Sequence, residues 1–457
     1  MARDVSDATP IESRDQLVAT LESGSKPKSE WRVGTEHEKF GFYLADHEPV
    51  PYEGPNGIRR LLEAMEGLLG WHRIEDEGRI IGLTDPLDLG AISLEPGGQL
   101  ELSGAPLKTI HQTCREVNAH LAQVRECATP LGIGFLGSGF SPKWSLGETP
   151  IMPKQRYDIM RGYMPKVGGH GLDMMLRTCT IQANLDFSDE ADMVQKMRVG
   201  LALQPIVTAL FANSPFADGK PNGFQSYRAE MWRDTDTART GMLPFAFEDG
   251  FGFERYVDWA LDVPMYFVKR GDRYFDVTGT TFRSYLSGSL DNSLPDARPT
   301  MSDWKNHLST LFPEVRLKNY LEMRGADGGP GRRICAVPAL WVGLLYDSVA
   351  LDGAWEIVKD WTGAEREALR DAVPKNGLKA TIRGRSVRDI GRDIVALARA
   401  GLSRRSYLNG EGIDETIFLS SIEEVLASGM TPADQIMHEY ERDWHGDIDR
   451  IFEAYAY

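Results

Sequence analysis

The chain has 457 residues, with 51 Lys and Arg against 67 Asp and Glu, so its formal net charge is −16 at pH 7. Its 42% hydrophobic and 26% charged residues are ordinary for a globular protein, and the length suffices for a well-buried core. Because nucleic acids and anionic membrane surfaces are bound mainly through an excess of Lys and Arg, the acidity argues against both as partners.

The N-terminal segment and the cysteines indicate a compartment. Residues 1–24 carry charges throughout and lack the apolar centre of a secretory signal. No apolar run approaches the roughly 18 residues of a membrane span. The four cysteines form no CxxC pair, which argues against a zinc ribbon or a disulfide-rich scaffold. We therefore expect a cytoplasmic protein with mostly reduced thiols.

Three segments of the first half of the chain are predicted to be helices, two of them because apolar residues recur at helical spacing. Residues 58–69 show this period, with Asn56 as the expected N-cap and Gly70 as the stop. Residues 110–124 give a second helix with the same spacing. The most apolar stretch, residues 199–211, is expected to be a buried helix rather than a membrane span.

The last part of the chain is expected to be mostly helical. The basic segment at residues 379–405 has apolar positions at helical spacing, so a solvated helix face explains it better than an anion-binding patch. Thr431 and Asp434 form an approximate capping box at the start of another helix. We expect one catalytic domain over residues 1–457, with a helical subdomain at 355–457.

Four segments alternate polar and apolar residues with the period of two that is typical of strands. They cover residues 31–43, 92–103, 176–187 and 319–327. Because helices separate them at irregular intervals, the pattern favours an α+β sheet over regular βαβ winding.

The polar faces of these strands carry the best candidates for chemistry. The candidates are Glu36, Glu38, Glu95, Glu101, Gln182, Glu322 and Arg324. Two acids at i and i+2 are usually a solvated face of an antiparallel sheet. Four such faces can instead line a cleft that holds Mg²⁺, a hard cation that prefers oxygen ligands and retains substrate phosphates. Spacing alone leaves both interpretations open.

Two weaker patterns are interpreted as structural. Residues 132–137 match GxGxxG, but Gly139 and Pro142 oppose a helix after it, so a glycine-rich strand is expected. Arg332 and Arg333 follow a glycine-rich loop, and surface or ion-pair arginines are favoured over phosphate ligands.

Several long blocks of sequence occur in an order that is specific to a known family. They include GTEHEKFGF at 34–42, SLEPGGQLELSGAP at 93–106, RYDIMRGYMPKVG at 156–168, GLDMMLRTCTIQANLDFS at 171–188 and FPEVRLKNYLEMRGADGG at 312–329. With these blocks the chain, over roughly residues 30–350, resembles the glutamate–cysteine ligases (γ-glutamylcysteine synthetases) of the plant and proteobacterial type.

The resemblance implies a glutamine-synthetase-like fold, in which a curved antiparallel sheet surrounded by helices forms a funnel lined by metal-binding glutamates. The implied reaction is the ATP- and Mg²⁺-dependent joining of the γ-carboxylate of L-glutamate to L-cysteine through a γ-glutamyl phosphate. This reaction gives γ-glutamylcysteine in the first step of glutathione biosynthesis. Two to three Mg²⁺ ions are the implied cofactors, ATP and the two amino acids are the small-molecule partners, and a monomer or a homodimer is expected.

The resemblance also assigns roles to individual residues. The implied metal ligands are Glu36, Glu38, Glu95, Glu101, Gln182 and Glu322. The implied catalytic arginines are Arg324, which steadies the transferring phosphoryl group, Arg228 and Arg177. Substrate binding is assigned to Arg228, Tyr266, Trp232 and Arg156. The ATP phosphates are assigned to Arg324, Lys166 and Arg283.

The cysteines depart from the plant pattern. Plant members carry a redox-sensitive pair in the segment that here reads FDVTGTTFRSYLSGSLDN, and this chain has Val277 and Asn292 at the aligned positions. That switch is therefore expected to be absent. Cys114 and Cys335 align with a second pair of some plant enzymes, and we expect them to be buried free thiols in a reducing cytosol.

Other functions stay open from the sequence. A related γ-glutamyl ligase with a different acceptor amine would carry the same motifs. A glycoside hydrolase would use two of the glutamates as acid and nucleophile, and it would need no ATP. A non-catalytic metal- or nucleotide-binding protein is the third alternative.

Overall fold

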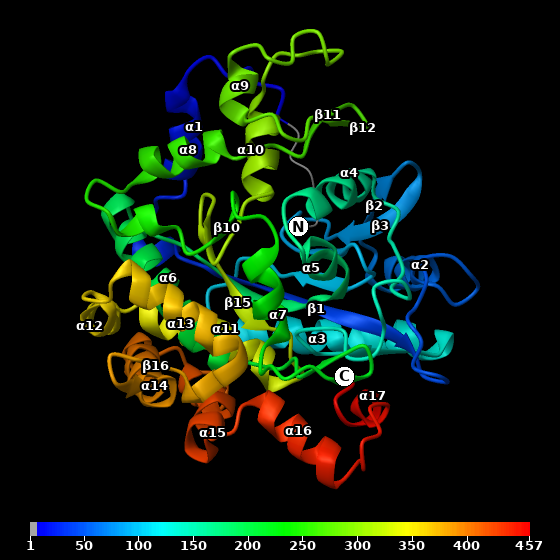
Figure 1. Ribbon diagram of the computed structural model, residues 1–457, viewed down its shortest axis with the longest axis vertical. Helices are drawn as coiled ribbons and strands as arrows, with labels where there is room; N and C mark the ends of the chain where they lie inside the picture. The colour runs from blue at the N-terminus through cyan, green and yellow to red at the C-terminus, as the bar shows by residue number, and fades with distance from the viewer. Residues whose placement is uncertain (1–6) are drawn as a thin grey trace.

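The computed structural model describes residues 7–457, and within them one large sheet organises the molecule (Figure 1). Its nine strands follow the order β14-β15-β7-β1-β5-β4-β3-β2, with β6 also paired to β1, and every pair is antiparallel. The strands are β1 Val33–Tyr43, β2 His72–Asp76, β3 Arg79–Thr84, β4 Ala91–Leu94, β5 Leu100–Ser103, β6 Ile133–Leu136, β7 Thr180–Leu185, β14 Val315–Leu317 and β15 Leu321–Asp327. The expected α+β class with an antiparallel sheet is confirmed.

Helices and short ribbons surround this sheet. The helices are α1 Arg14–Glu22, α2 Ile58–Leu69, α3 Ile110–Ala128, α4 Gln155–Tyr163, α5 Gly171–Arg177, α6 Glu190–Leu210, α7 Tyr227–Met231, α8 Phe253–Asp262, α9 Phe282–Leu286, α10 Met301–Ser309, α11 Arg332–Leu345, α12 Ser348–Val358, α13 Gly363–Asn376, α14 Val387–Arg405, α15 Ser420–Ser428, α16 Pro432–Arg442 and α17 Arg450–Ala454. The ribbons pair β8 Phe216–Ala217 with β9 Lys220–Pro221, β10 Thr240–Gly241 with β13 Phe312–Pro313, β11 Phe267–Arg270 with β12 Arg273–Asp276, and β16 Thr381–Ile382 with β17 Arg385–Ser386.

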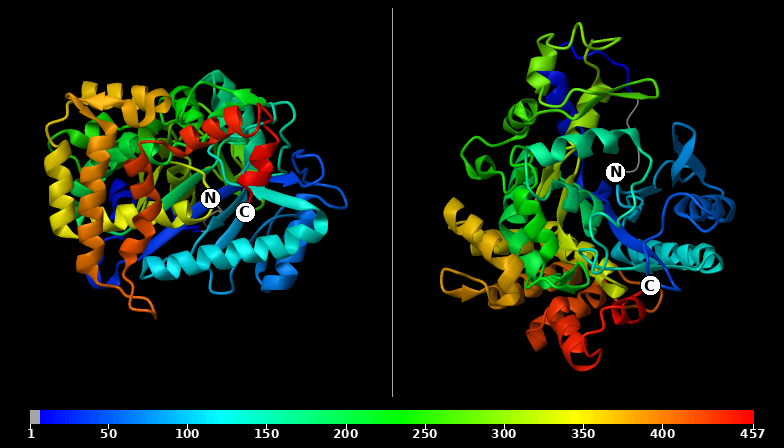
Figure 2. Two further views of the ribbon diagram at one scale, coloured as in Figure 1. Left: turned by 90° about the horizontal axis from the view of Figure 1, so that it is seen from below. Right: turned by 45° about the vertical axis from the view of Figure 1, so that its right-hand side comes forward.

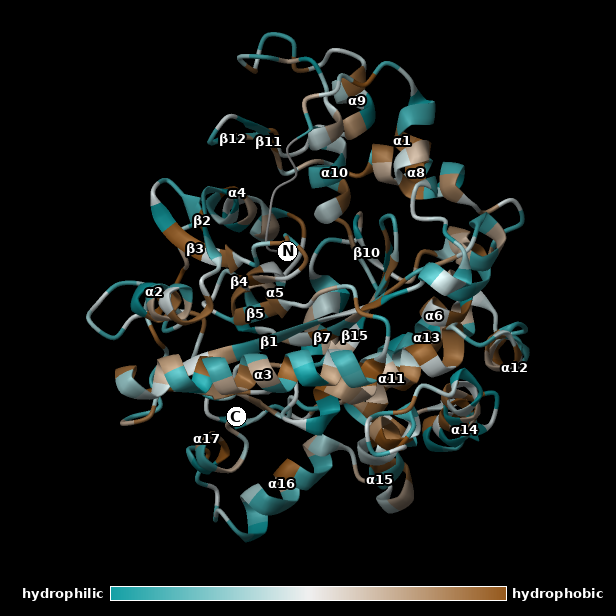
Figure 3. Ribbon diagram, turned by 180° about the vertical axis from the view of Figure 1, so that it is seen from behind, coloured by the Kyte–Doolittle hydropathy of each residue, from teal (hydrophilic) through white to brown (hydrophobic). Residues whose placement is uncertain are grey.

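One face of the sheet is covered by helices α3, α6 and α11, with α3 and α11 in front of the strands in Figure 3 and α3 along one side of the sheet in Figure 2. Gly200 of α6 lies directly against Met323 of β15 and Val315 of β14, so the helix approaches the strands closely. Residues of α6, α11 and α14 join the sheet in the largest hydrophobic core. The opposite face lies toward α4, α5 and α7, and it is therefore the face left for a site (Figure 1).

The predicted strands are confirmed with two differences. Residues 92–103 form two strands, because Pro96 and two glycines turn the chain between β4 and β5. Gly98 adopts a φ of +84°, and a Cβ on Gly97 would meet the Leu176 carbonyl oxygen at 2.0 Å. Leu176 lies in the last turn of helix α5, which ends at Arg177, and β7 begins only at Thr180.

The predicted helices are confirmed with changed ends. Helix α2 begins after Gly57 rather than after Asn56, and it ends at Gly70 with a φ of +64° as expected. The capping box of Thr431 and Asp434 is present at α16. That helix ends at Arg442, and α17 is separate from it.

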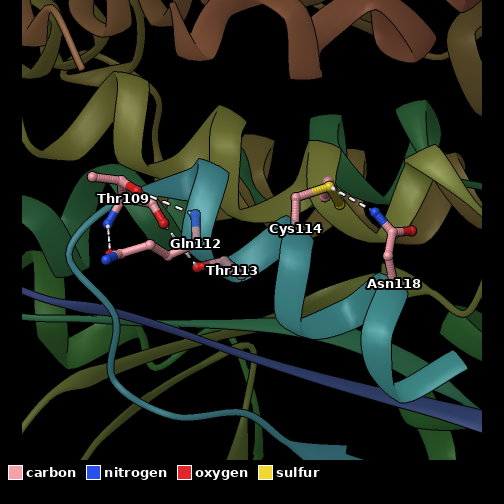
Figure 4. The surroundings of a disulfide bond; sticks show 6 residues. Thr109, Gln112, Thr113, Cys114 and Asn118 are labelled. Atoms are coloured by element: carbon pink, nitrogen blue, oxygen red, sulfur yellow. Dashed lines mark hydrogen bonds between the residues drawn. A yellow bond between two sulfur atoms is a disulfide. The ribbon is translucent and has the colours of Figure 1, made fainter. Parts of the chain in front are cut away.

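Cys114 of α3 and Cys335 of α11 form a disulfide (Figure 4). Their Cα atoms lie 5.5 Å apart, within the usual range for a disulfide, because the two helices pack together. Cys127 and Cys179 are buried free thiols. The expectation that Cys114 and Cys335 are free thiols is therefore wrong.

In the described part of the chain, no single helix is both long and apolar enough to cross a membrane, and α11 and α12 meet that test only as a pair bent by 90°. A helical subdomain at residues 355–457 stays a prediction. Helices α13 and α14 from this region contribute to the same hydrophobic core as α6 and α11.

Candidate active site

Two adjoining cavities lie on the open side of the sheet. The narrower one, about 110 Å³, lies over β1 and β7 and includes Glu36, Glu38, Gln182, Arg228 and Arg324 in its walls. The broader groove, about 1050 Å³, is lined by residues of β1, α10 and the β14–β15 hairpin, among others. Glu36, Ser309 and Arg316 belong to both walls, so the two cavities meet at these residues.

Strand register brings the predicted carboxylates together. On β1, Glu36 lies opposite Gln182 of β7, and Glu38 lies opposite Glu101 of β5. The next residue, His37, faces the other way and contacts His120 of α3, with ring centroids 5.4 Å apart. The period of two therefore sorts the site residues of β1 from its structural residues.

Burial raises the pKa of both β1 glutamates. For Glu36, repulsion from Glu322 and Glu101 adds to the effect of burial on the pKa. For Glu38, burial and then repulsion from Glu95 and Glu101 raise the pKa well above its ordinary value. Each has one neutral donor: the Asn184 amide donates to Glu36 at 2.8 Å and the Thr180 backbone N–H donates to Glu38 at 2.9 Å.

Glu95 lines the narrow cavity, whereas Glu101 is buried opposite Glu38 and does not belong to the cavity wall. The hydroxyls of Ser93 and Ser103 donate to the two carboxylate oxygens of Glu101 at 2.7 and 3.0 Å. These hydrogen bonds fix the orientation of the Glu101 carboxylate below Glu38.

Glu322 is fully buried among cations. Arg316 binds both of its carboxylate oxygens, one of them at 2.8 Å from Nη2, and Arg324 Nη1 lies 3.2 Å away. Burial alone would raise the pKa of Glu322, but Arg316, Lys318 and Arg324 outweigh it and hold that pKa well below its usual range. The carboxylate is thus ionised and already bound by arginine.

Two arginines and a tryptophan form the other wall of the narrow cavity. Arg324 donates to the Gln182 side-chain oxygen at 2.7 Å, and Arg228 donates to the Arg324 carbonyl at 2.9 Å. Trp232 lies about as close to both guanidinium groups, 5.8 Å from Arg228 and 5.9 Å from Arg324. Arg228 Nε and Trp232 Nε1 are buried donors with no hydrogen-bond partner. Buried donors of this kind are normally satisfied by a ligand or by water.

Six residues that the resemblance places at the site lie outside the walls of both cavities: Glu101 and Glu322, described above, and Arg177, Tyr266, Lys166 and Arg283. Arg177 is paired with Asp173 and Asp218 at 2.9 and 2.7 Å. The Tyr266 hydroxyl contacts Met164 Sδ at 3.6 Å in a buried cluster. Arg283 pairs with Asp262 at 2.6 Å, and Lys166 is exposed at the end of a short 3₁₀ turn. By contrast, Arg156 and Trp232 line the narrow cavity.

The sequence interpretation missed Arg316 and Lys318. Arg316 lies opposite Glu322 in the β14–β15 pair, and Lys318 lies 3.6 Å from the same carboxylate. Both alternate with the buried residues Val315 and Leu317. The period-two rule that identified the glutamates would have found them as well.

Comparison with known proteins places the chain in a family. The model of the glutamate–cysteine ligase family 2 matches residues 32–454. The chain belongs to this family. It is 56% identical over 450 residues to "Glutamate--cysteine ligase, chloroplastic" from Arabidopsis thaliana, covering 98% of this chain and 84% of the relative. It is 55% identical over 445 residues to "Glutamate--cysteine ligase B, chloroplastic" from Oryza sativa subsp. japonica, covering 97% and 87%. The chain is thus an enzyme of the glutamate–cysteine ligase type.

The fold comparison agrees with the sequence comparison. A crystal structure of glutamate–cysteine ligase from Francisella tularensis in complex with AMP superposes with a TM-score of 0.55 at 14% identity, covering 93% of this chain and 87% of that one. The glutamine-synthetase-like fold expected for the ligase is confirmed. The expected cytoplasmic location is wrong, because the plant relatives are named as chloroplastic enzymes.

Proposed function

We propose that the protein joins the γ-carboxylate of L-glutamate to the amine of L-cysteine, with ATP and Mg²⁺, to give γ-glutamylcysteine, ADP and phosphate. The observation that carries this proposal is the meeting of two chemically different cavities at Glu36 and Arg316. One offers buried donors for an amino acid and the other offers cations for a nucleotide. A ligase that first phosphorylates a carboxylate needs both substrates at one junction.

The amino acids are assigned to the narrow cavity. A carboxylate there would accept from Arg228 Nε and Trp232 Nε1, the two buried donors without partners. The wall also carries Met160, Met174 and Phe267, which give the aliphatic part of an amino acid an apolar surface. The cavity therefore suits a small molecule with one charged end and one apolar end.

ATP is assigned to the broad groove. Its walls carry five basic side chains, those of Lys26, Arg32, Lys305, Arg316 and Lys318, against three acidic ones, those of Glu36, Asp88 and Asp186. A triphosphate in this groove would point its terminal phosphate toward the junction, where Arg316 stands. The volume of about 1050 Å³ suffices for a nucleotide.

The oxygen donors at the junction fit Mg²⁺. Glu36, Glu38, Glu95 and the Gln182 side-chain oxygen are hard ligands. The raised pKa values of the two β1 glutamates reflect burial and then repulsion from neighbouring glutamates, and a divalent cation counters both. Residues 7–457 contain no group of three or more His, Cys, Asp or Glu side chains close enough to hold a metal ion by themselves. The proposal therefore includes phosphate oxygens and water as further ligands. Mg²⁺ bound there supplies neutralisation of the charge on the approaching anions.

The residues of the chain position the substrates for two successive steps. In the first, an oxygen of the glutamate γ-carboxylate forms a bond to the γ-phosphorus and ADP leaves; Arg324 and Arg316 stabilise the charge that spreads over the transferring group. In the second, the cysteine amine forms a bond to the acyl carbon and phosphate leaves. The narrow cavity limits access of water to the acyl phosphate, which would otherwise hydrolyse.

Phosphate release with Mg-ATP tests the proposal. With both amino acids present, we expect continuous release and an equal amount of γ-glutamylcysteine. Without glutamate, release should fall to background; with glutamate alone, it should be slow, because the acyl phosphate stays in the cavity. Release that does not depend on glutamate would contradict the proposal. A series of other amines in place of cysteine separates the cysteine ligase from a related ligase with another acceptor.

A further inference from the structure

A third cavity lies where helix α11 begins, next to α15 and α16. It has a volume of about 300 Å³ and is lined by the Pro330–Arg333 segment, by residues of α15 and by Gln435 of α16. None of its lining residues belongs to the two cavities at the active site. In Figure 3, α15 and α16 lie at the lower edge of the molecule, below α11.

Two donors inside this cavity lack hydrogen-bond partners. Ser421 is 6% exposed, and its Oγ is buried without a partner. Arg333 Nη1 is buried and likewise unpaired, while its Nη2 lies 3.4 Å from the Gln435 side-chain oxygen, a long hydrogen bond. Buried donors without acceptors are costly, and they indicate a missing acceptor.

The charge of the lining leaves Arg333 uncompensated. Glu424 is the one carboxylate among the residues that line this cavity, and Arg332 binds both of its oxygens, at 2.8 and 2.6 Å. The Tyr455 hydroxyl donates to Glu439 at 3.0 Å. The cavity therefore has one buried guanidinium whose charge no lining residue balances.

The start of α11 adds a favourable dipole at the same place. The helix has 14 residues, and Gly331 at its N-cap offers no side chain to cap it. Gly331 has a φ of +58°, and a Cβ built on it would have no atom within 4 Å, so the end of the helix is open. The N–H groups of Arg333 and Ile334 already donate to the Pro330 and Gly331 carbonyls at 3.4 and 3.2 Å, so the helix end favours an anion mainly through its dipole. Cys335, in the next turn, ties α11 to α3 through the disulfide and holds this end in place.

We infer that this cavity binds a tetrahedral oxyanion, a phosphate or sulfate group, held by Arg333 and Ser421 beside the N-terminus of α11. The oxygens of a phosphate or sulfate group accept from a guanidinium and a hydroxyl at once, which are the two unpartnered donors present here, and the helix dipole favours their charge. The inference does not rest on the proposed ligase reaction, because the cavity shares no residue with that site.

A selenate soak of crystals of the whole protein locates the anion, since selenate is tetrahedral and gives an anomalous signal. We expect a peak within hydrogen-bond distance of Arg333 and Ser421. Calorimetric titration with inorganic phosphate at constant ionic strength, with chloride as the reference anion, then measures affinity. Phosphate bound at the active site gives a separate binding phase, which Arg324→Met removes.

Three variants make the test specific. Arg333→Gln should weaken phosphate binding about tenfold or more, and Ser421→Ala should weaken it about threefold. The control Arg392→Gln removes an exposed arginine that pairs with Asp389 on α14, and it should change nothing. All three should keep the melting temperature and the rate of phosphate release with Mg-ATP. Absence of the selenate peak, or unchanged phosphate affinity in both Arg333→Gln and Ser421→Ala, would overturn the inference.

Discussion

Glu36 and Glu38 carry like charges where little water can screen them. Burial, followed by repulsion from neighbouring glutamates, raises the pKa of each above the value of about 4.5 that a free glutamate has. The metal-free folded protein therefore holds these protons more tightly than the unfolded chain. The stability that these two protonated groups contribute is fully present below about pH 4.5, and it is lost as the pH rises through the raised pKa values.

The double variant Glu36→Gln, Glu38→Gln tests how much stability the ionisation of these two groups costs. In magnesium-free buffer at pH 8, we expect it to melt at a higher temperature than the unsubstituted protein, because neutral amides replace repelling carboxylates. The difference should vanish toward pH 4.5. Added Mg²⁺ should raise the melting temperature of the unsubstituted protein only. Equal melting temperatures at pH 8 would show that ionisation of these two buried carboxylates costs the folded state no stability.

Variants of two arginines compare a residue of the narrow cavity with a residue of the surface. Arg228 lines that cavity, whereas Arg283 is paired with Asp262 on the surface. Arg228→Lys should lower kcat/KM for glutamate about 10- to 100-fold, because lysine cannot reproduce the planar fork of donors. Arg283→Lys should leave it unchanged. Steady-state kinetics with varied glutamate measure both, and a comparable loss in the two variants would remove Arg228 from the proposed substrate site.

The residues that sequence alone predicts well are those governed by strand alternation. Glu36, Glu38, Gln182 and Arg324 came from the period of two, and the structure brings them to one cavity. Positions fixed by tertiary contacts were not predictable in this way. Arg177, for example, lies outside the cavities and forms ion pairs with two aspartates, one of which is 41 residues further along the chain.

At the scale of the elements, the disulfide joins two helices that local patterns cannot relate. Cys114 and Cys335 are separated by 221 residues, so no helical or strand period connects them. Expectation about the compartment led to the wrong prediction of free thiols. The helices themselves were predictable, because apolar spacing defines α2 and α3, and α6 contains the most apolar stretch of the chain. The break between α16 and α17 was not, because it depends on His445 and Gly446, both with positive φ.

Helix α3 offers a test of what the crosslink contributes. Cys114→Ser removes the disulfide, and Cys127→Ser changes a buried free thiol on the same helix. Under oxidising conditions, we expect Cys114→Ser to lower the free energy of unfolding by about 2–4 kcal/mol, since a long loop is no longer closed. Cys127→Ser should cost less. Dithiothreitol should abolish the difference between Cys114→Ser and the unsubstituted protein in thermal melts; a difference that persists would trace the loss to packing instead.

At the scale of the whole molecule, we propose that the two cavities receive different substrates and meet at one junction. Lys318 belongs to the broad groove, and Arg156 belongs to the narrow cavity. The sheet arrangement that creates this division was implied by the family resemblance. The position of the groove was not, because its basic residues come from the N-terminal region, α10 and the β14–β15 hairpin, which only the fold brings together.

Two substitutions test this division. Lys318→Met should raise the KM for ATP about tenfold and leave the KM for glutamate unchanged, while Arg156→Met should do the reverse. Initial rates with each substrate varied at saturating levels of the other measure both constants. If either variant raises both KM values equally, the substrates do not enter by separate routes.

The cations of the broad groove also determine how a nucleotide reaches a protein with a net charge of −16. At physiological ionic strength, charges more than about 8 Å apart are largely screened. An approaching polyanion is therefore repelled only weakly by the acidic surface until it nears the groove. There, basic lining residues outnumber acidic ones by five to three. Lowering the salt lengthens the screening distance for all charges. This adds repulsion from the distant acidic surface, whereas the attraction of the nearby groove changes less. Capture of the nucleotide should then become slower in dilute buffer, the opposite of the usual salt dependence for a polyanion and a basic site.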